Sequence, residues 1–229
     1  MTTPAAPDFV RTWVESLTPV TLGEIAPDPT SAAIFSADMI NGFLYFGPLA
    51  SPRVAALEAP VVSLFQRSWD HGIREFVLPH DAHTENTPEF GAYPPHCLAG
   101  SGESETIPAL ANLPFADAFT VIEKNSLNPA IGTVFDGWLD IHREITTAIV
   151  VGDCTDLCVY QLAMHLRMRA NALDIADFTV VVPANAVDTF DIPASEEMPA
   201  GAAHPGSFFH EVFLYHMAQN GIRVVSSIA

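Results

Sequence analysis

The chain has 229 residues, of which 49% are hydrophobic and 16% are charged, enough apolar material for one large α/β domain. Twenty-seven acidic side chains stand against nine basic ones, and the formal net charge is −18. Nucleic acids and anionic membranes are bound through clustered Lys and Arg, so we expect neither as a partner.

Six segments along the chain are β-branched and nearly continuously apolar. They lie at residues 31–38, 73–81, 117–124, 146–153, 177–183 and 222–228. Helical patterns occur between them, at residues 52–72, 133–143, 155–171 and 206–221, after an amphipathic start. Apolar strands that alternate with helices predict a three-layer α/β/α fold, in which a mostly parallel six-stranded sheet carries helices on both faces.

The connections between these elements predict one domain over residues 1–229, with residues 1–30 as an N-terminal extension that contains a helix. Gly72 and Gly221 each close a helical pattern just before a strand, as C-terminal caps do. The connections at 82–106 and 184–205 are unusually long, and long connections are often functional. The start shows no signal-peptide pattern and no apolar run would span a bilayer, so we expect a cytoplasmic protein.

Four charged residues stand where predicted strands end: Asp38, Asp81, Lys124 and Asp153. In an open parallel sheet, ligands bind beyond the carboxyl ends of the strands. Lys124 is the only lysine of the chain, and its compact ammonium fits a narrow site better than a guanidinium would. Strands often end in polar residues, however, and one lysine can remain in a low-lysine chain by chance.

The segment GDCTDLCV (152–159) is typical of a strand, a tight turn and the start of a helix. Thr155 or Asp156 could cap that helix, which would place Cys158 in its first turn. The positive helix end favours a thiolate there, and the N–H groups of Cys154 and Cys158 could hold an oxyanion. A buried structural role is nevertheless the commoner fate of a cysteine.

Two other strand ends favour a nucleophile over a buried structural cysteine. Asp38 could take the thiol proton of Cys158, and Lys124 could lower the thiol pKa while it holds the carboxylate in place.

These segments resemble the isochorismatase-like cysteine hydrolases. DMINGF (38–43) resembles the aspartate-bearing strand end of that family, EKNSLNPAIGT (123–133) its lysine segment, and GDCTDLCV its nucleophile turn, over roughly residues 30–228. The resemblance implies a catalytic triad of Asp38, Lys124 and Cys158. It also implies a cis peptide bond between Asp153 and Cys154 that aims the Cys154 N–H into the oxyanion hole.

The segment HDAHTENTPEFGAYPPHC (80–97) contains a second set of chemical groups. Asp81 and His83 can face one side of an extended segment, and His96 returns after a loop stiffened by two prolines. Aspartate with imidazoles suits Zn, Fe or Mn, and Glu89 or Glu85 could add a carboxylate, directly or through water. Histidines in a loop are also often simply solvated.

The second segment resembles the nicotinamidase branch of the same family, which binds a divalent metal. The resemblance implies Asp81, His83, Glu89 and His96 as ligands, with zinc as the expected ion and iron or manganese as alternatives. Glu89 stands where many members have His. In that branch the metal takes the pyridine nitrogen of nicotinamide and aromatic rings enclose the substrate, which implies substrate-binding roles for Phe43 and Tyr93, although ordinary packing explains each ring equally well.

Two departures from the family pattern flank Asp38 and bear on the substrate more than on the chemistry. Ile40 stands where glutamine is frequent, and Gly42 where a second aspartate is frequent.

The resemblance therefore implies a metal-dependent nicotinamidase that forms nicotinic acid and ammonia through a cysteine thioester. We expect a small carboxamide substrate and a homo-oligomer. Two alternatives remain: another amide or ureide hydrolase of the family with the same triad, and a non-catalytic metal-binding domain. We predict structural or surface roles for the other histidines, at positions 71, 80, 142, 165, 204, 210 and 216, and a packing role for Cys97.

Overall fold

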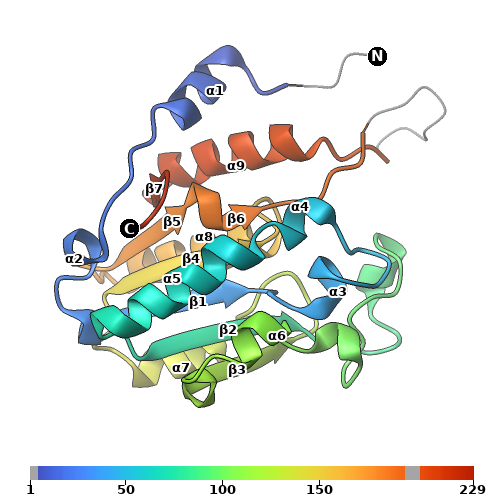
Figure 1. The fold of residues 1–229 in the computed structure, drawn as a ribbon, viewed down its shortest axis with the longest axis horizontal. Helices are drawn as coiled ribbons and strands as arrows, with labels where there is room; N and C mark the ends of the chain where they lie inside the picture. The colour runs from blue at the N-terminus through green and yellow to red at the C-terminus, as the bar shows by residue number, and fades with distance from the viewer. Residues whose placement is uncertain (1–4, 194–201) are drawn as a thin grey trace.

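A parallel sheet runs through the molecule in the order β3-β2-β1-β4-β5-β7 (Figure 1). The computed structural model describes residues 5–193 and 202–229. The strands are β1 (Ala32–Ala37), β2 (Glu75–Asp81), β3 (Phe119–Lys124), β4 (Thr147–Asp153), β5 (Thr179–Pro183) and β7 (Arg223–Val225). The two-residue β6 (Val187–Asp188) pairs with the end of β4. All the strand pairs are parallel, which confirms the six predicted strands and adds one short strand.

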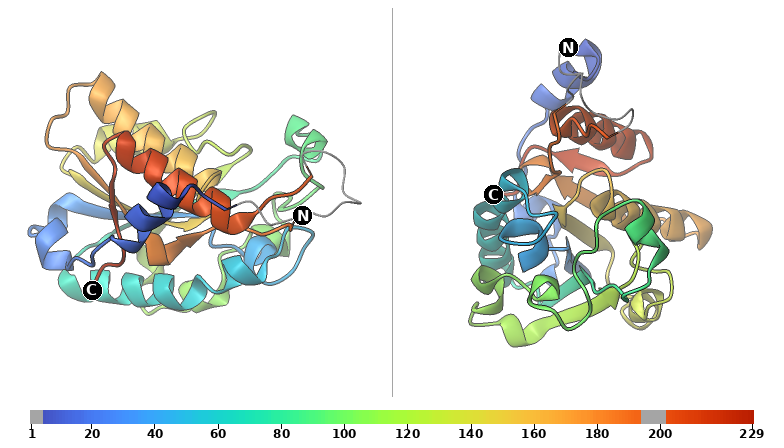
Figure 2. Two further views of the ribbon diagram at one scale, coloured as in Figure 1. Left: turned by 90° about the horizontal axis from the view of Figure 1, so that it is seen from above. Right: turned by 90° about the vertical axis from the view of Figure 1, so that its right-hand side faces the viewer.

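Helices cover both faces of the sheet, as predicted (Figure 2). On one face α5 (Glu58–His71) buries Val61 and Phe65 against Phe76 of β2. On the other face α7 (Phe135–Ile141), α8 (Cys158–Ala172) and α9 (Gly206–Gln219) share a core with β1 and β4. Strands β1 and β4 are buried at every position, because both of their faces are covered.

Shorter helices complete the chain. They are α1 (Asp8–Glu15), α2 (Leu22–Ile25), α3 (Asn41–Leu44), α4 (Pro52–Ala55) and α6 (Pro108–Ala111). In the predicted N-terminal extension, α1 packs on α9, where Phe9 and Trp13 meet the ring of Tyr215 edge to face. No helix within residues 5–193 and 202–229 is long and apolar enough to cross a membrane.

The helix predicted over 52–72 is divided into α4 and α5. Pro60 explains the break, because a proline lacks the N–H of a helical hydrogen bond and its ring clashes with the carbonyl four residues earlier, here Ala56. The C-terminal cap is confirmed at Gly72, which has a φ of 114° and donates to the carbonyls of Ser68 and Trp69.

The carboxyl ends of the strands meet at one edge of the sheet, together with α3 and the 82–106 connection (Figure 1). The 82–106 connection contains two short 3-10 turns, Pro88–Gly91 and Gly102–Ser104. The acidic stretch 194–201 of the other long connection lies outside the described residues.

Candidate active site

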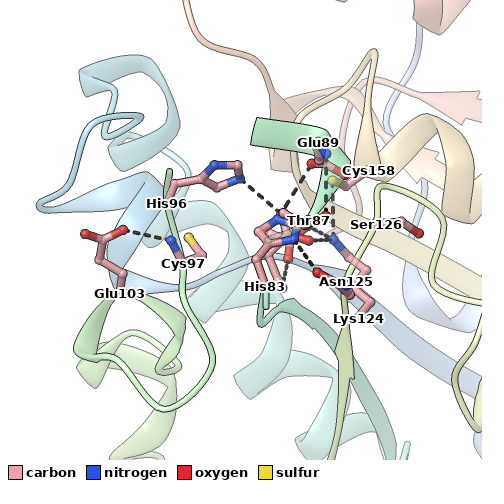
Figure 3. Close-up of polar contacts among 12 residues, drawn as sticks. His83, Thr87, Glu89, His96, Cys97, Glu103, Lys124, Asn125, Ser126 and Cys158 are labelled. Atoms are coloured by element: carbon pink, nitrogen blue, oxygen red, sulfur yellow. Dashed lines mark hydrogen bonds and ion pairs between the residues drawn. The ribbon is translucent and has the colours of Figure 1, made fainter. Parts of the chain in front are cut away.

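Lys124, at the end of β3, lies between two carboxylates and the thiol of Cys158, and Figure 3 shows Lys124 and Cys158 near each other. Its Nζ is 2.9 Å from Asp38 Oδ2, 2.5 Å from Asp81 Oδ1 and 3.5 Å from Cys158 Sγ. All four residues are at most 5% exposed. Removing charges from water is costly unless they are closely paired, and here one ammonium faces two carboxylates. The structure thus brings together the three residues predicted as a triad.

Asp38 is positioned by the backbone at the end of β1. Its φ of 51° is unusual for a residue with a side chain. The Asp38 N–H donates to Pro79 O at 3.0 Å, and the Asp81 N–H donates to Asp38 Oδ1 at 2.7 Å. Strand β2 therefore holds both the backbone N–H and the carboxylate of Asp38.

Burial sets the protonation of these groups. It raises the pKa of Asp38 to about 6, with help from the Asp81 charge and against the effect of Lys124. Burial also raises the pKa of the Cys158 thiol well above its usual value, and Lys124 only opposes this. The position of Cys158 at the helix end led us to expect a lowered thiol pKa. That expectation is wrong, because desolvation outweighs the effect of the nearby ammonium. Despite its own burial, Lys124 has a pKa raised well above its usual value by the carboxylates of Asp38 and Asp81.

The nucleophile turn joins β4 to α8. A Cβ on Gly152 would lie 2.0 Å from Ala37 O, so only glycine fits at this crossing. The peptide bond between Asp153 and Cys154 is cis, as the resemblance implied. Cys158 is the first residue of α8. Within the described part of the chain, neither the Cys154 N–H nor the Cys158 N–H has a backbone acceptor, so both remain available to an oxyanion.

The prediction that Thr155 or Asp156 caps α8 is wrong. The N-cap is Leu157, with no capping side chain. Both predicted caps bind histidines instead: Thr155 Oγ1 lies 2.9 Å from His210 Nδ1, and Asp156 Oδ2 lies 2.8 Å from His204 Nε2. The nucleophile turn is therefore tied to the chain that leads into α9.

A second cluster lies next to the first and shares Asp81 with it. The four residues predicted as metal ligands, Asp81, His83, Glu89 and His96, offer atoms that all lie within 4.8 Å of one another. His83 Nε2 is 3.5 Å from Asp81 Oδ2 and 3.6 Å from Glu89 Oε1, and His96 Nε2 is 3.9 Å from Asp81 Oδ2. Glu85 is exposed and outside the cluster.

The donor set fits a divalent cation. His83 Nε2 and Glu89 Oε1 are buried and have no hydrogen-bond partner among the described residues. The other ring nitrogens face acceptors: His83 Nδ1 is 3.1 Å from Asn125 Oδ1, and His96 Nδ1 is 2.8 Å from Pro94 O. An N–H on each Nδ1 leaves the Nε2 lone pairs directed at the centre, the arrangement seen in metal-bound histidines.

Both clusters contribute side chains to the lining of one pocket. Cys154 and Cys158 line it, and so do Asp81, Glu89 and His96. The aromatic rings predicted to contact the substrate, Phe43 and Tyr93, also line this pocket, and so does Phe190. The pocket is thus bounded by a thiol, a set of metal-ligand atoms and several aromatic rings.

Sequence reasoning missed three contributors to this site. Asn125 follows Lys124 directly, and its place in the lysine segment could have indicated a role beside His83. Phe190 and His204 carried no signal, because they come from the 184–205 connection and no periodic pattern places them. Cys97 is fully buried beside His96, consistent with the predicted packing role.

Comparisons with known proteins agree with the geometry. Residues 32–227 match the model of the isochorismatase domain family. The chain is 35% identical to Nicotinamidase 1 of Arabidopsis thaliana in an alignment 220 residues long, which covers 87% of this chain and 87% of that protein. The chain belongs to the isochorismatase family. It is accordingly an enzyme of the amidohydrolase class.

Two solved structures have a fold similar to that of this chain. Nicotinamidase PncA from Bacillus subtilis superposes with a TM-score of 0.65 at 25% identity, covering 85% of this chain and 99% of that one. N-carbamoylsarcosine amidase from Thermoplasma acidophilum superposes with a TM-score of 0.64 at 22% identity, covering 85% of this chain and 95% of that one. The second likeness shows the shared fold alone.

Proposed function

We propose that this chain is a metal-dependent nicotinamidase that hydrolyses nicotinamide to nicotinic acid and ammonia. One observation carries the proposal: the buried thiol of Cys158 and three of the four metal-ligand side chains, Asp81, Glu89 and His96, line the same aromatic-lined pocket. The similarity to a curated plant nicotinamidase supports the choice of substrate.

In the first half-reaction, Cys158 Sγ attacks the carboxamide carbon while the Asp38 carboxylate takes the thiol proton. The N–H groups of Cys154 and Cys158 stabilise the oxyanion that forms. Asp38 then gives its proton to the departing nitrogen, which leaves as ammonia, and a thioester to Cys158 remains. Lys124 stays charged throughout and stabilises the anions on either side of it.

In the second half-reaction, Asp38 removes a proton from water and the resulting hydroxide attacks the thioester carbonyl. The oxyanion returns to the same two N–H groups. When it collapses, the carbon–sulfur bond breaks, Asp38 returns its proton to the sulfur, and nicotinic acid is released. A raised pKa suits Asp38 to this exchange, because it must accept and donate a proton in each half.

Asp81, His83, Glu89 and His96 would hold the metal ion. When bound, it supplies a Lewis-acidic anchor for the ring nitrogen of the substrate. We propose zinc, since two imidazoles and two carboxylates suit it, with iron and manganese as alternatives that metal analysis would distinguish. We also propose that the chain acts in the cytoplasm as a homo-oligomer of single-domain subunits.

Ammonia release from nicotinamide by the purified protein tests the proposal. We expect sustained turnover by the wild type and none above background by Cys158→Ala. Turnover of another amide or a ureide with no turnover of nicotinamide would contradict the substrate and favour the other family chemistry. Turnover that survives Cys158→Ala would contradict the thioester mechanism.

A further inference from the structure

Three aromatic rings between β6 and the first turns of α9 form a stack that ends at the pocket. The rings of Phe190 and His204 have centroids 3.8 Å apart and an interplanar angle of 16°. Phe209 covers the other face of His204 at 4.4 Å and 12°. Since Phe190 also lines the pocket, the stack presents its last ring to the space beside Cys158.

His204 is fixed at both of its ring nitrogens. Nδ1 is 3.0 Å from Phe190 O, and Nε2 is 2.8 Å from Oδ2 of Asp156, a buried residue of the nucleophile turn. The backbones of Ile192 and His204 also form an antiparallel bridge with two hydrogen bonds of 2.8 Å. The plane of the imidazole is therefore set by the nucleophile turn and by Phe190 itself.

The backbone around Phe190 has little freedom to move. Arg53 of α4 donates to Thr189 O at 3.1 Å and pairs with Asp188 at 2.5 Å. On the other side, a Cβ on Gly206 would come within 2.6 Å of Phe190 O, so α9 begins in direct contact with this carbonyl. These contacts fix the backbone from which the Phe190 ring projects.

On the basis of the proposed nicotinamidase function, we propose that Phe190 packs against the ring of the substrate and that His204 is a positioning residue for it. Phe43 and Tyr93 line the same pocket, so Phe190 adds a further aromatic wall on the side of the nucleophile turn. A flat, neutral heteroaromatic ring gains contact with such walls, and an aliphatic amide gains less. Phe190 thereby helps to select an aromatic carboxamide.

Steady-state kinetics on nicotinamide test the role of Phe190. Loss of one aromatic contact in Phe190→Ala should raise KM about tenfold and change kcat less than about threefold. Phe190→Leu keeps apolar volume without a flat face, so its KM should lie between those of the wild type and Phe190→Ala. The control is Phe9→Ala, the same substitution at a ring that is 62% exposed and lies on α1, and its KM should equal that of the wild type.

Two substitutions separate the stacking of His204 from its hydrogen bonds. His204→Gln removes the flat ring but keeps a donor for Asp156, and should raise KM about threefold or more with kcat retained. His204→Phe keeps the stack and should leave KM within about twofold of the wild type. The opposite ranking of these two variants would overturn the positioning role.

The outcomes distinguish this inference from the function on which it rests. A wild type that releases no ammonia from nicotinamide contradicts the proposed function itself. An active wild type whose KM is unchanged by Phe190→Ala leaves the function standing and overturns the inference. The same holds if kcat falls in Phe190→Ala while KM does not change, because the ring would then act on the chemical step.

Discussion

Two clusters meet at Asp81 and balance their charges in different ways. Around Lys124, one ammonium lies within ion-pair distance of the carboxylates of both Asp38 and Asp81, so these two anions share a cation that the protein itself supplies. Around His83, buried atoms of two side chains have no partner among the described residues, and carboxylate oxygens face the imidazole nitrogens. The difference indicates that the carboxylates of the first cluster already face a cation of the chain, whereas the second cluster is built for a bound cation.

The largest expected effect tests whether the first cluster performs the chemistry. Cys158→Ala should lower kcat at least about ten-thousandfold, because it removes the thiol that forms the proposed thioester. The variant should still bind metal with the wild-type stoichiometry, since Cys158 is not in the second cluster. Ammonia release and metal analysis on the same sample check this. Loss of the metal together with activity would show that the clusters are not separable.

The next effect tests the charge balance around Lys124. Lys124→Met leaves two buried carboxylates without their cation and should cost about 3–5 kcal/mol of folding free energy. Urea unfolding at neutral pH measures it. Lys124→Met with Asp38→Asn, which removes one of the stranded charges, should recover part of the loss. If Lys124→Met alone were as stable as the wild type, that result would contradict the account of this cluster.

A metal-ligand substitution tests the second cluster. His83→Ala removes one buried nitrogen and should lower metal occupancy and reduce kcat/KM more than about a hundredfold. The alkylation rate of Cys158 by iodoacetamide should change little, because the contacts between Lys124, Asp38 and the thiol are preserved. Asn125→Ala, which affects His83 only through its Nδ1 contact, should produce a smaller loss in the same direction. Full metal occupancy in His83→Ala would contradict the assignment.

The raised pKa of Asp38 predicts a pH dependence. The carboxylate must be ionised to accept the thiol proton, and burial raises its pKa to about 6, so the active form is lost as the pH falls through that value. Below it, kcat/KM should drop about tenfold per pH unit. The pH profile of stable wild-type protein measures this. An activity plateau that extends down to the range of an ordinary aspartate would show that Asp38 is not the base.

The smallest effect concerns Glu89, one of the two carboxylates among the proposed metal ligands. Glu89→His should retain the metal, with an affinity within about tenfold of the wild type. Glu89→Ala should weaken binding more than Glu89→His does. Titration with zinc in competition with a chelator compares the two variants. Equal affinity of Glu89→Ala and the wild type would place Glu89 outside the metal shell.

The sequence predicts the parts of this site that follow from strand ends. Parallel register brings Asp81 opposite Lys124, so residues 43 positions apart in the chain become neighbours once the strands are recognised. The ends of β1 and β4 add Asp38 and the cysteine turn in the same way. Local spacing likewise links Asp81 to His83.

The remaining features depend on tertiary contacts that no local pattern encodes. Thr155 and Asp156 suit a helix cap, but contacts with His210 and His204 take precedence in the folded chain. The two-residue strand β6 is too short to produce a periodic signal, and it is this strand that leads to Phe190. The raised thiol pKa of Cys158 is likewise a consequence of burial, which a helix-end argument does not include.

The central claim is that a metal-binding cluster and a thiol cluster act on one substrate. Chelation of the wild-type protein tests it most directly, with ammonia release from nicotinamide and the iodoacetamide alkylation rate of Cys158 followed on the same sample. We predict that chelation abolishes ammonia release, leaves the alkylation rate unchanged, and is reversed by added zinc. Ammonia release that continues undiminished after the metal has been removed would contradict the account.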